Sequence, residues 1–354
     1  MPPTTTKVIT MMVFTVGLVI STVACSETKT ASDQVTPTTK IPSVQEVQNH
    51  SGNEVQQETL EESSEEPTEH SHTHEHLEEL NSNYLSDYTI FDTVFGTETT
   101  VTVVNDSRII TTNALPDHET GDFPNAGNPN TISAQSSTYE YTTNPVNTGS
   151  AKEVHVPGVA VNGVKFEPGT AETVTCASGE TYRVEGLQEV FNLGMDFNNA
   201  HVQPTGAYHY HGLSELLAET HNESGRDLIH VGFAADGYLM YISTSGAYSP
   251  SYQLSTISRT GSNCVLSLGN HGQGRSITVE GTTPDGSYTS DWDYVPRLGD
   301  LDECNGTVID GQYAYIITDN FPYISRCLKG DFTEIRPMGP GGPQTGPPPR
   351  NNNR

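Results

Sequence analysis

Basic residues are scarce in this chain of 354 residues, which carries 16 Lys and Arg against 44 Asp and Glu. So acidic a surface repels phosphate backbones, and we expect no nucleic-acid partner. The chain also lacks a His-Glu-x-x-His segment, a Gly-x-Ser-x-Gly segment and a phosphate-binding glycine loop. The usual signatures of zinc proteases, serine hydrolases and nucleotide-binding proteins are therefore missing.

Long apolar runs are missing too, because the run from Val8 to Ile20 is shorter than the ~20 residues that a membrane span requires. With Lys7 before it and Ala24-Cys25 after it, the run indicates an export signal over residues 1–25. Its end resembles a bacterial lipoprotein signal, in which Cys25 is lipidated; ordinary cleavage after Ala24 is the alternative. We expect a membrane-anchored protein of the cell envelope.

Residues 26–82 contain no Phe, Trp or Tyr and are rich in Thr, Ser, Gln and Glu, so they cannot form a core. We interpret them as a disordered, acidic tether, and residues 337–354, rich in Pro, Gly and Asn, as a disordered tail. His70, His72, His74 and His76 give the tether the capacity to bind zinc, copper or nickel weakly, unless they are only part of a solvated acidic tract. One folded domain is expected over residues 83–336.

Alternating apolar residues within that domain predict β-strands, and Asn-Gly and Asp-Gly pairs predict the turns between them. Short helices are expected only at Leu213–Glu219 and Leu187–Leu193. We therefore predict a mainly β fold, a sandwich or irregular double sheet with one or two short helices. The strands are expected at 99–104, 159–161, 164–166, 230–233, 238–241 and 313–317.

Four cysteines besides Cys25 lie in the exported part of the chain, where an oxidising compartment favours disulfides. Four cysteines allow three pairings. We predict the bonds Cys304–Cys327 and Cys176–Cys264.

The most distinctive segment is Tyr208-His209-Tyr210-His211. On a strand, His209 and His211 point to one face about 7 Å apart along the chain, and the tyrosines point to the other face. The two imidazoles indicate a zinc or copper site, unless they only form hydrogen bonds with neighbours. Such a site needs further ligands. The candidates are His201, His230, His118 and Asp236.

These residues belong to a longer pattern that resembles the YHYH domain family of bacterial proteins, named for the four residues at 208–211. The resemblance covers roughly residues 112 to 330 and implies no particular activity. Besides the name motif, it rests on Pro116–His118, Gly121–Asn125, Asn128–Asn130, Gly232–Tyr238, Gly299–Gly306 and Thr318–Tyr323.

A second group of candidate ligands is acidic and precedes Cys304. Calcium favours such oxygen ligands, but the spacing of an EF-hand is absent, and we expect these acids to cap turns instead. The group consists of Asp291, Asp293, Asp300, Asp302 and Glu303.

Three functions are consistent with these features. The first is a lipid-anchored protein that binds a metal ion. The second is a metal-dependent hydrolase in which Asp236 or His118 acts as acid or base. The third is an adhesion or carbohydrate-binding module without a metal, with Tyr208, Tyr210 and Trp292 as its contact surface.

Overall fold

A computed structural model describes residues 82–222, 225–267 and 274–333 of the chain. Contacts divide the chain into Met1–His72 and Thr73–Arg354, and all described residues belong to the second unit. No helix in the described part is both long and apolar enough to cross a bilayer. The predicted signal, Cys25, the four tether histidines and the predicted tail at residues 337–354 lie outside the described residues.

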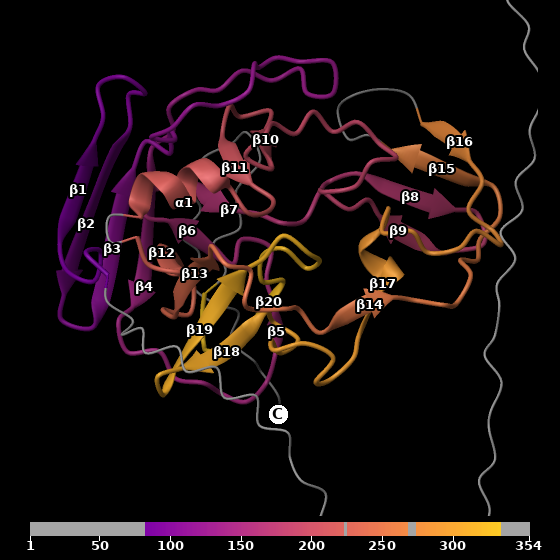
Figure 1. Cartoon of the computed structure of the whole chain (residues 1–354). Coiled ribbons are helices and arrows are strands. Elements are labelled where there is room, and N and C mark those ends of the chain that lie inside the picture. Colours follow the sequence, from indigo (N-terminus) through magenta and orange to yellow (C-terminus); the bar gives the residue numbers. More distant parts are fainter. Residues whose placement is uncertain (1–81, 223–224, 268–273, 334–354) are drawn as a thin grey trace, which may run out of the picture. The chain divides into compact units, whose positions relative to one another are not determined.

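Two neighbouring sheets contain most of the strands (Figure 1). The first is an antiparallel sheet in the order β1-β2-β3-β4, and it packs against a larger sheet in the order β10-β11-β7-β6-β12-β13-β19-β18. Two pairs in the larger sheet are parallel, β11 with β7 and β13 with β19. The strands of the first sheet are β1 (Tyr88–Phe91), β2 (Glu98–Val104), β3 (Ser107–Thr112) and β4 (Ser137–Thr142); those of the larger sheet are β6 (Gly158–Ala160), β7 (Lys165–Phe166), β10 (Ala200–Val202), β11 (Tyr208–Tyr210), β12 (Leu228–Ala234), β13 (Leu239–Ser243), β18 (Gly306–Ile309) and β19 (Gln312–Ile317).

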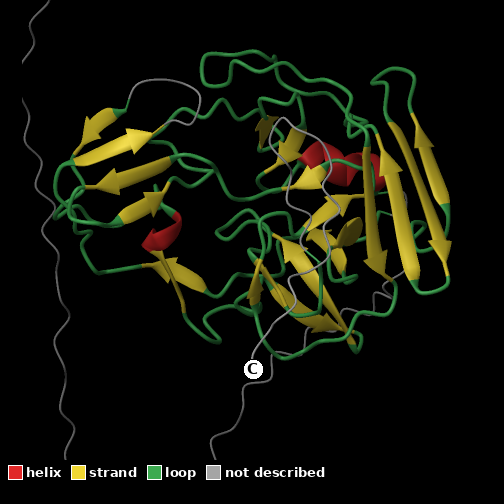
Figure 2. Cartoon of the chain, turned by 180° about the vertical axis from the view of Figure 1, so that it is seen from behind, coloured by secondary structure: helices red, strands yellow, loops and turns green. Residues whose placement is uncertain are grey.

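Three smaller sheets complete the described part, and Figure 2 shows the same elements from behind. One has the order β16-β15-β8-β9, and the other two are the pairs β14 with β17 and β5 with β20. Their strands are β5 (Lys152–Glu153), β8 (Thr173–Cys176), β9 (Thr181–Arg183), β14 (Tyr252–Leu254), β15 (Cys264–Ser267), β16 (Arg275–Ile277), β17 (Trp292–Tyr294) and β20 (Cys327–Leu328). The predicted mainly β fold is confirmed, as are the predicted strands.

Alternation along the strands divides the core into layers. Val159 and Val161 face the first sheet and pack with Val101, Ile110 and neighbouring tyrosines. Ala160 faces the other way, into a separate cluster that contains Tyr208 and Tyr210. Because successive side chains of a strand point to opposite faces, one short strand serves both clusters.

Two predicted turns are needed where the larger sheet meets the first one. Gly163 lies between β6 and β7 at a φ of +88°, and a Cβ there would lie 2.0 Å from Thr112 Oγ1. Gly237 lies between β12 and β13 at a φ of +93°, and its Cβ would lie 2.2 Å from the carbonyl oxygen of Thr142. Both positions therefore require glycine for conformation and for space.

The helix α1 spans Glu215–His221, close to the predicted Leu213–Glu219, and lies against β12. Ser214 caps it by accepting the Leu217 N–H at 3.1 Å. The second predicted helix is wrong, because residues 187–193 form bends. The Gln188 side-chain oxygen accepts the Val190 and Phe191 N–H groups there, and such local bonds compete with a helix.

Both predicted disulfides are confirmed. Cys176 and Cys264 face each other directly across β8 and β15, and their bond connects strands 88 residues apart in sequence. The bond between Cys304 and Cys327 holds β20 to the segment before β18. The second bond thereby fixes the position of the neighbouring Arg326, which contacts the candidate site described next.

Candidate metal centre

His209 and His211 lie on one face of β11, as the alternation predicts. The antiparallel pairing of β10 with β11 places His201 directly opposite His209. On the other side of β11, the parallel strand β7 places Lys165 opposite His209. Three short strands therefore bring a row of polar side chains together on one face of the larger sheet.

Tyr208 and Tyr210 occupy the opposite face of β11 and are fully buried in the core. Tyr208 donates its hydroxyl hydrogen to Asp196 Oδ2 at 2.7 Å, and the ring of Tyr210 lies 5.6 Å from that of Phe166. Large buried rings with bonded hydroxyl groups hold the strand in one position. The histidines on its other face are therefore positioned by the core.

The three imidazoles converge. The Nε2 atoms of His209 and His211 lie 2.9 Å apart, and the ring of His201 lies 4.7 Å and 4.6 Å from the two other rings. One nitrogen from each residue can be chosen so that all three lie within 4.8 Å of one another. In the described part of the chain, this is the only group of three or more His, Cys, Asp or Glu residues with such geometry.

Each Nδ1 atom faces a backbone carbonyl oxygen. His201 Nδ1 lies 2.9 Å from the oxygen of Leu193, and the Nδ1 atoms of His209 and His211 lie 3.4 Å from those of Ala207 and Pro168. A carbonyl oxygen only accepts, so these contacts favour a hydrogen on Nδ1 and a free lone pair on Nε2. Metal-binding histidines are commonly oriented by hydrogen bonds of this kind.

All three imidazoles are held in the neutral form. Burial lowers the pKa of His209 well below its usual range, and the adjacent His211 and His201 lower it further. Burial likewise lowers the pKa of His211 well below its usual range, and that of His201 to a smaller degree. Neutral imidazole is the form that binds a metal ion, so no proton has to be removed at neutral pH.

The walls of the centre are closely packed around His211. A Cβ on Gly186 would lie only 2.6 Å from His211 Nδ1, so the backbone of Gly186 lies directly against the imidazole. Arg326 donates to the Pro168 oxygen at 3.4 Å and pairs with Glu185 at 2.5 Å. His211 and Arg326 thus share one carbonyl oxygen, and both are fixed by it.

The YHYH family model matches residues 138–330, more than half of the chain. The chain belongs to the YHYH protein family. The match ends at residue 330, as the resemblance predicts. It begins at residue 138 instead of residue 112, so β1, β2 and β3 lie before it. Comparison with curated proteins and with solved structures found no match.

Three of the six predicted ligands lie elsewhere in the YHYH protein. His230 binds Ser82 Oγ at 2.5 Å through Nδ1 and the oxygen of Gly232 at 2.9 Å through Nε2. Asp236 accepts from the Tyr315 hydroxyl at 2.7 Å and the Gly330 N–H at 2.9 Å, and so holds a turn. Both residues therefore bond to other groups, and neither belongs to the cluster formed by His201, His209 and His211.

His118 lies on the tyrosine face of β11. Its Nε2 atom lies 2.6 Å from the hydroxyl of Tyr210, which also accepts from Asn162 Nδ2 at 3.0 Å. The same Asn162 donates to Asp117 Oδ1 at 2.9 Å, and Asp117 Oδ2 lies 3.1 Å from His221 Nε2. Sequence reasoning missed this buried chain, although Asp117 and His118 are adjacent in the sequence; both precede the family match.

The predicted contact surface of tyrosines and tryptophan is wrong. Tyr208 and Tyr210 are buried, and Trp292 stacks on Phe321 with ring centres 4.8 Å apart. Two of the acidic residues before Cys304 cap turns, as predicted: Asp291 accepts the Tyr288 N–H and Asp302 accepts the Cys304 N–H. Asp291 also binds the guanidinium of Arg259.

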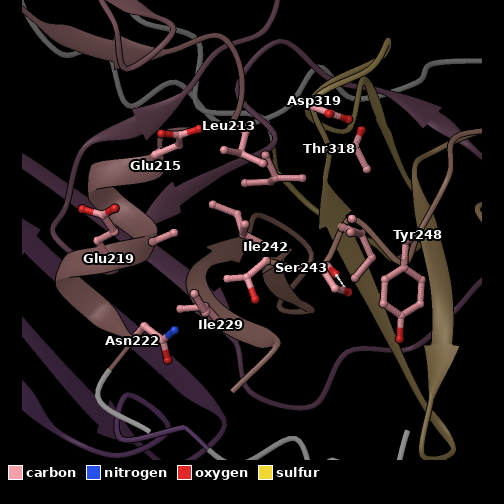
Figure 3. A pocket seen from close by; sticks show the side chains of 16 residues that line it. Leu213, Glu215, Glu219, Asn222, Ile229, Ile242, Ser243, Tyr248, Thr318 and Asp319 are labelled. Carbon is pink, nitrogen blue, oxygen red and sulfur yellow. Dashed lines mark hydrogen bonds between the residues drawn. The ribbon is translucent and has the colours of Figure 1, made fainter. Parts of the chain in front are cut away.

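A separate cleft of about 490 Å³ lies at the carboxyl ends of the parallel strands β13 and β19 (Figure 3). Ile229 and Ile242 line its apolar part, and Glu215, Glu219 and Asp319 stand around it. None of the three clustered histidines, His201, His209 and His211, which we call the triad, lines this cleft. Sequence reasoning missed it because its walls come from four segments far apart in the chain.

Proposed function

We propose that this YHYH protein binds a transition-metal ion, zinc or copper, through His201, His209 and His211. The observation that carries the proposal is the convergence of three imidazoles whose Nδ1 atoms face backbone carbonyls. Imidazole suits zinc and copper, whereas calcium and magnesium favour oxygen ligands.

The distances support an ion of this size. Two zinc-bound nitrogens at ~2.0–2.1 Å in a tetrahedral site lie about 3.4 Å apart. The Nε2 atoms of His209 and His211 are 2.9 Å apart, so small rotations of the two rings suffice to accept the ion. Without an ion, two lone pairs directed at each other at this distance repel, unless one Nε2 carries a hydrogen and donates it to the other.

Nearby carboxylates balance the charge of a divalent cation. Glu172 and Glu167 act electrostatically on His201 by favouring its charged form, and they favour a bound cation in the same way. Lys165 opposes this effect at His209, and Lys165 and Arg326 oppose it at His211. Both cations are paired, however, Lys165 with Glu167 at 2.5 Å and Arg326 with Glu185 at 2.5 Å. The net field therefore allows a cation beside three neutral ligands.

A metal-binding protein is favoured over a metal-dependent hydrolase. A hydrolase needs an acid or base beside the metal-bound water. The two residues predicted for that role, Asp236 and His118, bond to Tyr315 and Tyr210 instead. The proposal is therefore a metal-binding protein of the cell envelope.

The proposed location rests on the amino-terminal sequence, with a lipid on Cys25 and residues 26–82 as the tether. The two disulfide bonds support an exported protein, because disulfides persist in oxidising compartments. Palmitate labelling in a bacterial host tests the anchor: the proposal expects label in the parent protein and none in a Cys25→Ser variant.

Metal analysis tests the metal site. The parent for this experiment is the full chain with His70, His72, His74 and His76 replaced by Ser, so that the tether cannot bind metal. We expect one equivalent of zinc or copper per chain by mass spectrometry, and almost none after the double change His209→Ala, His211→Ala.

A matched control separates the loss of ligands from the loss of a buried histidine. His230→Gln changes a buried histidine outside the triad, and it should retain one equivalent of metal. Equal metal content in the triad variant and the parent contradicts the proposal. That result would instead favour a metal-free pair, in which His209 and His211 are joined by an Nε2–H···Nε2 hydrogen bond.

A further inference from the structure

A second cleft, of about 780 Å³, lies beside the other end of the larger sheet, where β13, β19 and β18 follow one another. The metal centre lies on β10, β11 and β7, at the opposite end of the strand order. Tyr238, Leu239 and Tyr313 form part of the wall of this cleft. Arg108 of the first sheet completes it from a strand that lies before the family match.

Arg108 is a buried cation without a counter-ion in the part of the chain that the structure describes. It occupies an inward-facing position of β3 and is 4 % exposed. One NH2 hydrogen goes to the oxygen of Leu85 at 3.1 Å, and the guanidinium lies 4.0 Å from the centre of the Phe233 ring. Its Nε atom has no hydrogen-bond partner among the described residues.

Tyr241 also lines this cleft and carries a second unsatisfied group. Its side chain is 1 % exposed, and within the described residues its hydroxyl has no hydrogen-bond partner. More than ~90 % of buried polar groups in proteins are hydrogen-bonded, so two such groups on one cavity require an explanation. Burial also lowers the pKa of Arg108, which is the direction expected when a cation lacks a partner.

We propose that this cleft binds a small organic carboxylate through Arg108 and Tyr241. A carboxylate matches the planar guanidinium and accepts from both groups. One arginine balances one negative charge, whereas a phosphate dianion in so acidic a protein requires more positive charge. The body of the ligand then contacts Tyr238, Leu239 and Tyr313, which suits an aromatic acid or a sugar acid.

The inference is independent of the metal site and makes an unusual prediction about stability. A buried charge without a counter-ion carries a desolvation cost, and an apolar side chain of similar size removes that cost, which offsets the loss of the bond from Arg108 to the Leu85 oxygen. Arg108→Met should therefore leave the melting temperature of the ligand-free protein unchanged or raise it. Tyr241→Phe should behave in the same way, because it removes a hydroxyl that has no partner.

Calorimetric titration of the full chain with sodium phenylacetate, sodium glucuronate and inorganic phosphate tests the inference. We expect one equivalent of phenylacetate or glucuronate to bind, and the tighter of the two identifies an apolar or a sugar body. Arg108→Met should weaken that binding by about tenfold to a hundredfold, the usual effect of losing a hydrogen bond to a charged group. Phosphate should bind at least tenfold more weakly than the better carboxylate.

Two controls make the outcome decisive. Arg183→Met changes an arginine of β9, in a different sheet, and should bind the carboxylate as the parent does. The double change His209→Ala, His211→Ala should also leave carboxylate binding intact. The inference is overturned if neither carboxylate binds, if Arg108→Met binds as tightly as the parent, or if binding disappears with the triad, since the carboxylate would then be a metal ligand.

Discussion

The pH dependence of folding depends strongly on His230, which is buried on β12 and bonded through both ring nitrogens. Burial lowers the pKa of His230 from 6.5 to about 3 in the folded protein. The unfolded chain therefore binds a proton at this residue between pH 6.5 and pH 3, whereas the folded chain does not. The stability due to neutral His230 is complete above pH 6.5 and is lost as the pH falls through this range.

The size of the effect at pH 5.0 follows from these two values. That pH lies ~1.5 units below the pKa of the unfolded state, and each unit corresponds to ~1.36 kcal/mol, so the folded state loses about 2 kcal/mol. The other buried histidines add to the loss in the wild-type protein. Replacing His230 by Gln, which does not titrate, removes this one contribution and leaves the others.

Urea unfolding of the oxidised, metal-free protein at pH 7.5 and pH 5.0 measures the effect. Between these pH values the free energy of unfolding should fall by about 2 kcal/mol more in the wild type than in His230→Gln. Comparing the fall, not the absolute stability, cancels any cost of the substitution itself. A difference under about 0.5 kcal/mol would refute the reasoning, because His230 would then titrate alike in the folded and unfolded states.

Three further predictions concern the metal centre and its support. Gly186→Ala should weaken metal binding by about tenfold to a hundredfold in a competition titration with a chelator, because the new methyl group displaces the His211 ring. Tyr210→Phe should lower the free energy of unfolding by about 1–3 kcal/mol, because His118 and Asn162 each lose a hydrogen bond to the Tyr210 hydroxyl. The metal content should stay at one equivalent. Removing the Cys304–Cys327 bond by changing both residues to Ser should cost about 3 kcal/mol in the same unfolding assay, and an unchanged midpoint contradicts this.

Local sequence patterns determined the features that depend on neighbouring residues. The alternation of Tyr208 to His211 predicted that two histidines share one face and two tyrosines the other, because a strand repeats every two residues. The Asn162-Gly163 turn followed for the same reason, since its conformation depends on the residues in it. The same local reasoning was wrong at residues 187–193, where the Gln188 side chain bonds to the backbone and replaces the helix.

Which histidine joins His209 and His211 was decided by tertiary structure alone. The sequence offered His201, His230, His118 and Asp236 beside the His209–His211 pair, and no local pattern selects one of them. His201 joins the pair because β10 lies beside β11, whereas the strand of His230 pairs with β6 and β13 and His118 bonds to the tyrosine face. Which strand lies beside which depends on the packing of distant side chains. The YHYH motif therefore determined two of the three clustered histidines, and the fold supplied the third.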